Sequence, residues 1–341
     1  MKKNFLRLVN LFEKITAGAL TPGIHTPFKV VSWWEKTRLL KYETTKTRKR
    51  FKTPIMFVPP LMTRHYIYDI NPWHSFIGHF LARGFECYIL DFGIPSQEDK
   101  ELTLSDHIVF IRNAVKRIGE ISKVRKITIC GYSMGGIMSI VYTSLFPASV
   151  KNLVVIGAPV DFSKMQPFHT LVKIFYPVLS YSTEKIGNIP PIFPKIGFRL
   201  LNPFSQLIIF FELWKNYWDR SWVMGYEAVS KWIHNFIPYP GSTFKNFITD
   251  FIRDDKLRKG EMFVIGKKVS LSNIKCPLLV FSGKRDNIAP EPCVSAITSY
   301  TSSKEKRLCR VPAGHLGLVV GREAPSYVWD EMVDWLKDKS D

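Results

Sequence analysis

The fold is decided by the stretch Lys126-Ile-Thr-Ile-Cys-Gly-Tyr-Ser-Met-Gly-Gly-Ile-Met-Ser-Ile-Val-Tyr142. Its first five residues are mostly apolar and include three β-branched residues in a row, Ile127 to Ile129, which predicts a short buried strand, and its last six predict a helix. The turn between them reads G-x-S-x-G, the pattern of a nucleophile elbow in its strand–turn–helix context. Gly131, Gly135 and Gly136 leave room there for the neighbouring backbone. Ser133 presents its hydroxyl at the N-terminus of the helix, where the helix dipole favours developing negative charge.

Short apolar strands alternate with longer helices on both sides of this stretch. An alternation of this length predicts an α/β fold, in which a mostly parallel central sheet is covered by helices on both faces. In the helix at 105–122, four aliphatic residues share one face behind a Ser105 cap. The other strands are predicted at 55–58, 87–90, 153–156, 277–281 and 308–311, and the other helices at 74–83, 291–302 and 324–337.

The alternation stops within residues 161–269, which are rich in aromatic residues and proline and show no clear strand series. We therefore predict a core formed by residues 51–160 and 270–341, with a mainly helical cap inserted between its two parts. Residues 1–50 are predicted to form an amphipathic helix followed by an irregular basic segment.

Three cap tryptophans and one loop histidine are candidates for a substrate pocket. Trp214, Trp218 and Trp222 are spaced by four, so a single helix would carry all three on one face. Such a face either packs on the core or lines a pocket for an apolar substrate. His65 follows the first core strand and is the histidine closest to the predicted site outside the catalytic set.

A serine nucleophile requires a base, and the base requires an orienting acid. With this elbow the expected order along the chain is serine, acid and then histidine, each at the carboxyl end of a strand. Asp286 and His315 each follow a predicted strand in that order, so Ser133, Asp286 and His315 are predicted to form a catalytic triad. Asp91 is a competing acid, but it precedes the nucleophile and is better suited to shaping the turn Asp91-Phe-Gly-Ile-Pro95.

Acyl transfer also requires two N–H donors for the tetrahedral oxyanion. The backbone N–H of Met134 is the first, because it follows the nucleophile. The second is expected in the loop after the first core strand, Val58-Pro-Pro-Leu-Met62. Proline has no N–H, so Leu61 is the first residue of this loop that can donate.

At these residues the chain resembles the polyhydroxyalkanoate synthases of the α/β-hydrolase superfamily, particularly the short catalytic subunit of the two-component kind. The resemblance covers roughly residues 25–340, including the cap. The matching stretches are Val58-Pro-Pro-Leu61, Tyr66-Ile-Tyr-Asp-Ile70, Asp91-Phe-Gly-Ile-Pro95, Asn152-Leu-Val154, Pro159-Val-Asp-Phe162, Gly187-Asn-Ile-Pro190, Lys231-Trp-Ile233, Phe247-Ile-Thr-Asp250, Lys259-Gly-Glu261 and Ile274-Lys-Cys-Pro277.

The resemblance implies an α/β-hydrolase fold, a hydroxyacyl-CoA donor, a growing polyester acceptor and a partner subunit. This chain departs from the family pattern at one position, because the family normally has cysteine where this chain has Ser133. Cys130 lies three residues earlier, in the strand, and does not replace it. A thiolate suits thioester exchange, whereas serine forms an oxyester, the usual route to hydrolysis.

Three functions therefore stay open on the sequence. The acyl group on Ser133 passes either to a polymer chain end, as in a synthase, or to water, as in an esterase or a polyester depolymerase. The third is a non-catalytic hydrolase-like protein that binds lipid or granules. A fluorophosphonate probe, which reacts with an activated serine, separates the third from the first two.

Net charge and cysteine content restrict the classes of binding partner and cofactor that we expect. The 341 residues carry a formal net charge of +19, which favours an anionic partner, but no nucleic-acid reader motif accompanies it. The phosphates of CoA and an acidic membrane, granule or partner surface remain. Five cysteines without a C-x-x-C pair argue against a disulfide framework and a zinc site, so we expect a reducing compartment and no metal or cofactor.

The N-terminal helix is the predicted element closest to a surface partner. Phe5, Leu8 and Val9 recur at helical spacing together with Phe12 and Ile15, and Lys3 and Arg7 lie on the other side. Such a helix either packs on its own domain or lies on a membrane or granule surface. The apolar residues are too interrupted for a secretory signal, so we expect a cytoplasmic protein that is soluble or peripheral, either alone, as a homodimer or with a partner subunit.

Overall fold

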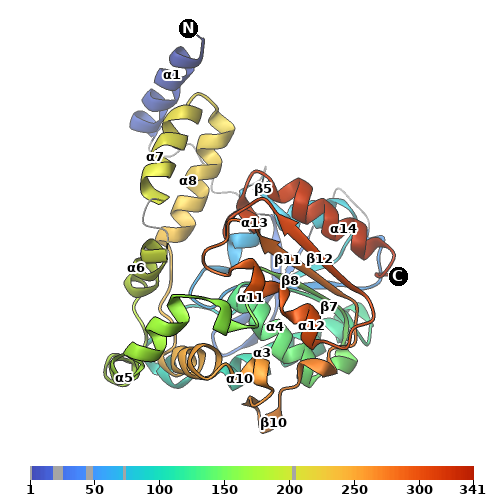
Figure 1. Cartoon of the computed structure of the whole chain (residues 1–341). Coiled ribbons are helices and arrows are strands. Elements are labelled where there is room, and N and C mark those ends of the chain that lie inside the picture. The colour runs from blue at the N-terminus through green and yellow to red at the C-terminus, as the bar shows by residue number, and fades with distance from the viewer. Residues whose placement is uncertain (1, 18–25, 44–48, 72–73, 202–204) are drawn as a thin grey trace.

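An eight-stranded sheet runs through the centre of the molecule (Figure 1). The computed structural model describes residues 2–17, 26–43, 49–71, 74–201 and 205–341. In spatial order the strands are β1 (Phe28–Trp34), β2 (Thr37–Tyr42), β6 (Cys87–Asp91), β3 (Ile55–Val58), β7 (Ile127–Tyr132), β8 (Val150–Ile156), β11 (Leu278–Gly283) and β12 (Lys306–Val311). The six strands β6, β3, β7, β8, β11 and β12 pair in parallel, and β1 and β2 are added to them in antiparallel orientation. This confirms the mostly parallel sheet.

The prediction of an irregular segment before residue 50 is wrong for residues 28–42. β1 and β2 form a hairpin, and β2 pairs with β6 through Leu39 opposite Leu90 and Leu40 opposite Ile89. Leu39 and Leu40 are both fully buried, because successive side chains point to opposite, covered faces of the sheet. The basic residues around this hairpin conceal that pattern. Residues 44–48, part of the basic run before β3, lie outside the described residues.

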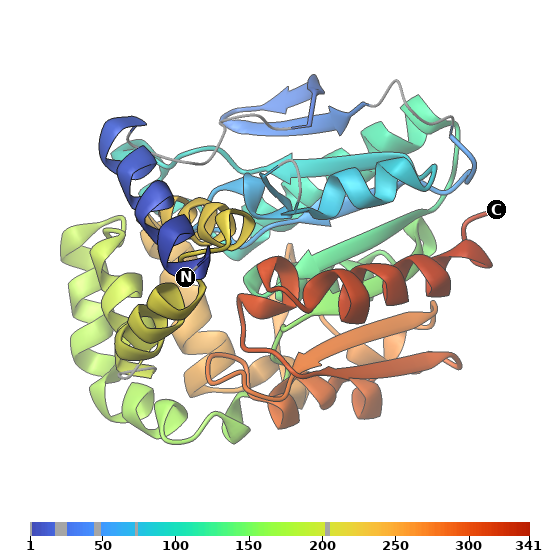
Figure 2. The same ribbon diagram turned by 90° about the horizontal axis from the view of Figure 1, so that it is seen from above.

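Helices cover both faces of the sheet (Figure 2). One core cluster joins the sheet to α3 (Leu104–Ser122), α4 (Met134–Leu145), α11 (Glu291–Ser295) and α12 (Ile297–Tyr300). The opposite cluster contains α2 (Phe76–Ala82), α13 (Gly317–Val320), the π-helical turn Pro325–Trp329 and α14 (Asp330–Lys337). Neighbouring residues of β3 alternate between the two clusters, Met56 in the first and Phe57 in the second. The α/β expectation is therefore confirmed.

The N-terminus of α3 differs in detail from the prediction. The cap is Thr103 and not Ser105, and Thr103 forms a capping box with Asp106. The Ser105 hydroxyl instead accepts a hydrogen bond from the Ile265 N–H at 3.2 Å. Either Thr103 or Ser105 could cap this helix on sequence grounds, and Asp106, three residues after Thr103, identifies Thr103 as the cap.

Residues 161–269 are mainly helical, as predicted. They lie beside the carboxyl edge of the sheet (Figure 1), and α1 lies against them. α1 spans Lys2–Ala17. The elements of residues 161–269 after the 3-10 turn at 162–164 are α5 (Phe168–Ile186), α6 (Ile192–Leu201), α7 (Ser205–Asn216), α8 (Arg220–His234), α9 (Gly241–Asn246), the π-helix η5 (Phe247–Arg253), α10 (Lys256–Lys259) and a small hairpin, β9 (Phe263–Val264) and β10 (Lys267–Lys268). Short elements complete the fold: β4 (Asp69–Asn71), β5 (His74–Ser75) and 3-10 turns at 65–68, 97–101, 147–149, 162–164 and 271–273.

Among the described helices, none combines the length and the apolar character that a bilayer crossing requires. The division of the chain into an N-terminal segment, a core and a cap stays a prediction.

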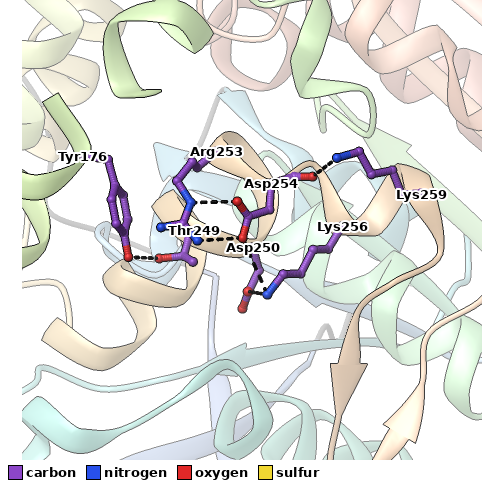
Figure 3. Close-up of polar contacts among 7 residues, drawn as sticks. All are labelled: Tyr176, Thr249, Asp250, Arg253, Asp254, Lys256 and Lys259. Carbon is purple, nitrogen blue, oxygen red and sulfur yellow. Dashed lines mark hydrogen bonds and ion pairs between the residues drawn. The ribbon is translucent and has the colours of Figure 1, made fainter. Parts of the chain in front are cut away.

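A polar cluster ties α5 to η5 and α10 (Figure 3). The guanidinium of Arg253 lies over the Tyr176 ring, 4.0 Å from its centroid, and is held by the carboxylate of Asp254 at 2.7 Å. The Tyr176 hydroxyl lies 3.2 Å from the Thr249 hydroxyl, and Lys256 pairs with Asp250 at 2.6 Å. These contacts fix the first cap helix to the segment that returns to the core.

The buried carboxylate of Glu86 makes the stability of the sheet sensitive to acid. Burial by itself would raise its pKa, but hydrogen bonds from Lys49, Lys41 and Tyr88 lower the pKa to about 2 from an ordinary 4.5. Lys41 lies 2.9 Å and the Tyr88 hydroxyl 2.7 Å from the carboxylate. A depressed pKa stabilises the folded state above pH 4.5, and that stabilisation is lost as the pH falls towards 2.

We expect the urea midpoint of the wild type to fall more steeply between about pH 4.5 and 2 than that of Glu86→Gln. Glu43→Gln is the control, because Glu43 forms an exposed pair with Lys29 and contributes little. Parallel pH profiles for the wild type and Glu86→Gln would contradict the assignment.

Candidate active site

Ser133 lies at a sharp turn between β7 and α4. Its backbone angles are φ 53° and ψ −124°, outside the regions that a serine ordinarily occupies. The six residues of β7 are buried, and the Ser133 N–H donates to the carbonyl of Ile156 in the neighbouring strand at 2.9 Å. The strained turn therefore holds Ser133 at the carboxyl edge of the sheet, where its side chain is half-buried.

Close backbone packing explains the three glycines of the elbow. A Cβ at position 131 would lie 2.5 Å from the Gly135 carbonyl oxygen, and one at 135 would lie 2.1 Å from the Val58 carbonyl oxygen. A Cβ at 136 would lie 2.6 Å from the Ala158 side chain. No side chain fits at these distances, so glycine is required at each position.

The structure brings Ser133, His315 and Asp286 together in one hydrogen-bonded chain. The His315 Nε2 lies 3.0 Å from the Ser133 Oγ, and the His315 Nδ1 lies 2.7 Å from the Asp286 Oδ2. Asp286 and His315 are 5% and 9% exposed, so solvent competes little with these contacts. This is the arrangement in which a histidine deprotonates a serine while an acid orients the imidazole.

Asp286 is held in place by the backbone that follows it. Its Oδ1 accepts hydrogen bonds from the N–H groups of Ile288 and Ala289, at 2.9 and 2.8 Å, which leaves Oδ2 for His315. The adjacent Arg285 does not neutralise the carboxylate, because its guanidinium donates to the Pro312 carbonyl. The backbone contacts to Oδ1 therefore hold the Asp286 carboxylate with its other oxygen, Oδ2, directed at the His315 imidazole.

Tyr132 holds the loop that carries His315. Its hydroxyl donates to the His315 carbonyl at 3.2 Å, and the two rings lie 5.1 Å apart. Tyr132 is fully buried, and burial raises the pKa of its hydroxyl well above the ordinary value. The sequence pattern does not single out Tyr132, because a tyrosine inside the elbow motif carries no signal for a partner 183 residues away.

Tyr132→Phe is expected to lower kcat several-fold at unchanged KM, because a hydrogen bond of about 1 kcal/mol no longer fixes the His315 loop. The pH dependence of kcat should also shift, which a purely structural role would not produce. Tyr239→Phe is the matched control, since the Tyr239 hydroxyl is buried without a hydrogen-bond partner among the described residues. Equal kcat in both variants would remove this role.

The two predicted oxyanion donors lie in adjacent segments. Met134 is the first residue of α4, so no earlier carbonyl of that helix is available to its N–H. The close approach of Gly135 to the carbonyls of Val58 and Pro59 places the loop after β3 against this helix start. Leu61, which follows in that loop, shares a core cluster with Met134. The donor pair stays a prediction that this packing supports.

His65, in the 3-10 turn at 65–68, and Asp91, the last residue of β6, form a separate pair. His65 Nδ1 lies 3.3 Å and an Arg38 nitrogen 2.5 Å from the Asp91 Oδ2. Asp91 Oδ1 also accepts the Gly93 N–H at 3.1 Å, so Asp91 shapes its turn, as expected, and is not the acid paired with His315. Burial alone would raise the Asp91 pKa, but His65 and Arg38 hold it below its usual range. A pocket role for His65 stays a prediction.

The prediction that one helix carries Trp214, Trp218 and Trp222 is wrong. The chain turns after α7, and the Asp219 side chain caps the new helix α8 by accepting the Trp222 N–H at 3.2 Å. Spacing by four cannot reveal such a break, whereas the cap residue can. Trp214 lies under Arg7 and Trp218 under Lys3, both of α1, so these contacts give no support to a substrate-pocket role.

Cys130 does not supply a nucleophile. It is fully buried in β7, its sulfur lies 4.0 Å from that of Met332, and burial raises the pKa of its thiol. All five cysteines are free thiols, with raised pKa values wherever a shift is resolved, so the thiolate form is disfavoured. Ser133 is therefore the nucleophile candidate that the geometry supports.

Comparison with known families gives two matches. Residues 53–321 match the α/β hydrolase fold, and residues 19–80 match the N-terminus of poly-beta-hydroxybutyrate polymerase (PhaC).

The chain is also similar to curated proteins called poly(3-hydroxyalkanoate) polymerase subunit PhaC. It is 31% identical to the protein from Haloferax mediterranei, over 93% of this chain and 65% of the relative. It is 30% identical to the protein from Thiocystis violacea, over 96% of this chain and 92% of the relative. The proteins from Thiocystis violacea and Allochromatium vinosum are thus matched over nearly their full lengths.

Solved structures show the fold alone. A thermophilic esterase from Thermogutta terrifontis superposes with a TM-score of 0.58 at 15% identity, over 94% of this chain and all of that one. A protein described as a non-heme bromoperoxidase from Mycobacterium tuberculosis gives 0.55 at 18% identity, over 88% of this chain and all of that one.

Proposed function

This chain belongs to the poly(3-hydroxyalkanoate) polymerase family of the α/β-hydrolase superfamily, and we propose that it transfers hydroxyacyl groups through a Ser133 acyl-enzyme. The observation that carries the proposal is the chain of contacts from Ser133 through His315 to Asp286, at 3.0 and 2.7 Å. The proposed donor is a hydroxyacyl-CoA thioester, and the proposed acceptor is the hydroxyl end of a polyester.

In the first step His315 Nε2 takes the proton of the Ser133 hydroxyl as the oxygen attacks the thioester carbonyl. The resulting oxyanion accepts hydrogen bonds from the Met134 and Leu61 N–H groups. The carbon–sulfur bond then breaks, and the imidazolium returns its proton to the departing CoA sulfur. Asp286 keeps the imidazole in the required orientation and stabilises its charged form. The product is an ester on Ser133.

In the second step an acceptor hydroxyl gives its proton to His315 and attacks the ester carbonyl, and Ser133 regains the proton. When the hydroxyl belongs to a chain end, the polymer grows by one unit. Water in the same position releases a free hydroxy acid, which is the hydrolase alternative. Serine at the nucleophile position favours that alternative, because an oxyester is less reactive than a thioester towards a hindered hydroxyl.

The deciding experiment supplies a 3-hydroxyacyl-CoA and follows both released CoA and polymer. Polymer growth supports the synthase, and CoA release with only free acid identifies a hydrolase. No CoA release at all contradicts the proposal. Ser133→Cys sharpens the comparison, since a higher ratio of polymer to free acid in that variant would show that the serine directs the acyl group to water.

The proposed setting is the cytoplasm or a surface within it. A homodimer or a partner subunit, which the family resemblance suggests, is part of the same proposal. A non-catalytic lipid- or granule-binding protein would have no need of an ordered chain from Ser133 to Asp286, so the geometry favours the enzyme.

A further inference from the structure

Exposed apolar side chains gather on one flank of the molecule. Of eighteen large hydrophobic side chains that are exposed among the described residues, thirteen lie on α1, α5, α6 and α7. These four helices lie along the same side in both views (Figures 1 and 2). We call this set of helices the apolar flank. Isolated exposed hydrophobic residues are ordinary, but such a concentration marks an interaction surface.

α1 packs on the molecule with its polar side. Arg7 donates to the Lys215 carbonyl at 3.2 Å, and the Asn10 amide donates to the Tyr217 carbonyl at 2.7 Å. Phe5 and Leu8, on the apolar side, are each 66% exposed. A helix that merely completed its own domain would bury these residues and expose the polar ones. The side chains of Phe12 and Ile15, predicted to extend the apolar side, lie outside the described residues.

α5 extends the apolar flank and combines exposed apolar side chains with lysines, as α1 does. Ile174, Phe175 and Val178 are 63%, 54% and 63% exposed, and Val178 lies one helical turn after the adjacent pair Ile174 and Phe175, so the three share one side of the helix. Lys185 extends over the ring of the exposed Tyr181, 5.7 Å from its centroid. Long lysine side chains and aromatic rings of this kind suit the boundary between headgroups and acyl chains of a bilayer.

The charged side chains of the apolar flank indicate that its partner is anionic. Among the described side chains of these helices, the exposed cations are Lys173, Lys185 and Lys215, together with Lys3, which lies over the Trp218 ring, and the exposed acid is Glu212. We infer that the apolar flank docks peripherally on a lipid bilayer that contains anionic headgroups. The apolar side chains would enter the headgroup boundary, while the lysines contact the anionic lipids.

Two other occupants fit the charge less well. A second copy of the chain would bring the same lysines against these, and like charges repel across an interface. A polyester surface is uncharged, so it would leave the lysines without a counter-charge. The docking proposal uses residues outside the Ser133 site, so it does not depend on the proposed acyl transfer.

The test is co-sedimentation of the full chain with vesicles. We expect at least tenfold stronger binding to vesicles with about 30% phosphatidylglycerol than to pure phosphatidylcholine, and most of the difference should vanish at about 0.5 M salt. Lys173→Ala and Lys185→Ala should each weaken binding roughly fivefold, because one cation near an anionic surface contributes about 1 kcal/mol. Lys268→Ala and Lys275→Ala, exposed elsewhere, are the charge controls.

The apolar arm of the test uses two matched pairs. The double variant Phe5→Ser, Leu8→Ser should lower binding at least tenfold. The control, Trp33→Ser with Phe263→Ser, changes residues that are 63% and 67% exposed on β1 and β9, away from the flank, and should bind like the wild type. Both doubles should fold normally, since exposed substitutions rarely change stability by more than about 0.5 kcal/mol.

Several outcomes would overturn the docking proposal. They are absence of vesicle binding, equal binding to neutral and anionic vesicles, and equal loss in both double variants. Binding to polyester particles but not to vesicles would assign the flank to the polymer. Loss of a wild-type dimer in Phe5→Ser, Leu8→Ser, without vesicle binding, would assign it to a second copy.

Discussion

Ser133→Ala is expected to abolish hydroxyacyl transfer, with kcat at least about 10⁴-fold below the wild type. Among the described residues no other nucleophile is placed to form the acyl-enzyme here, because the imidazole of His315 lies 3.0 Å from the Ser133 oxygen and Cys130 is buried in β7. Alanine keeps the shape of the turn apart from the hydroxyl, so the protein should remain folded. The measurement is CoA release from a 3-hydroxyacyl-CoA, with fluorophosphonate labelling as a direct readout of the activated serine.

The control for this prediction is Ser282→Ala. Ser282 lies at the carboxyl end of β11, and its hydroxyl is fully buried without a hydrogen-bond partner among the described residues. It should label and turn over like the wild type. Undiminished labelling of Ser133→Ala, or no labelling of the wild type, would refute the catalytic role of Ser133 and favour the non-catalytic alternative.

The positions of the candidate site residues follow from features that a sequence displays locally. Ser133, Asp286 and His315 each follow a short apolar strand, and parallel strands bring their carboxyl ends to one edge of the sheet. The structure places the three side chains in contact. Tyr132 could not be assigned, because its contact with the His315 carbonyl joins residues 183 positions apart. The N–H groups of Ile288 and Ala289 could not be assigned either, because their hydrogen bonds to Asp286 depend on the backbone conformation of that loop, which strand and helix patterns do not record.

The N-terminal half of the chain shows what local pattern misses. β2 is buried on both faces, yet its adjacent leucines, Leu39 and Leu40, are flanked by the basic residues Arg38 and Lys41, and the long-range pairing with β6 is what makes it a strand. For α1 the hydrophobic pattern predicted the helix correctly but left its orientation open. Cation–π contacts from Lys3 and Arg7 to cap tryptophans decide that orientation, and these contacts join residues more than two hundred positions apart.

The largest effect on stability is expected for Gly135→Ala. The added Cβ would lie 2.1 Å from the Val58 carbonyl oxygen and 2.7 Å from that of Pro59, and both are backbone atoms that cannot rotate away. Either α4 or the loop after β3 must move, at the centre of the buried sheet. We expect the free energy of unfolding to fall by more than about 4 kcal/mol, the range of severe packing and strain defects. Chemical denaturation followed by circular dichroism measures this loss.

The same substitution connects stability to the site. Moving the loop after β3 separates the Leu61 N–H from that of Met134, so any folded fraction of Gly135→Ala should lose at least about 10²-fold in kcat, the contribution of one oxyanion donor. Gly225→Ala is the matched control, because Gly225 lies inside α8 and a Cβ there meets no atom within 4 Å. Alanine should stabilise that helix by about 0.5–1 kcal/mol and leave kcat unchanged. If both variants unfold at the same denaturant concentration, the steric requirement at the elbow is disproved, and with it the placement of Leu61 beside the nucleophile.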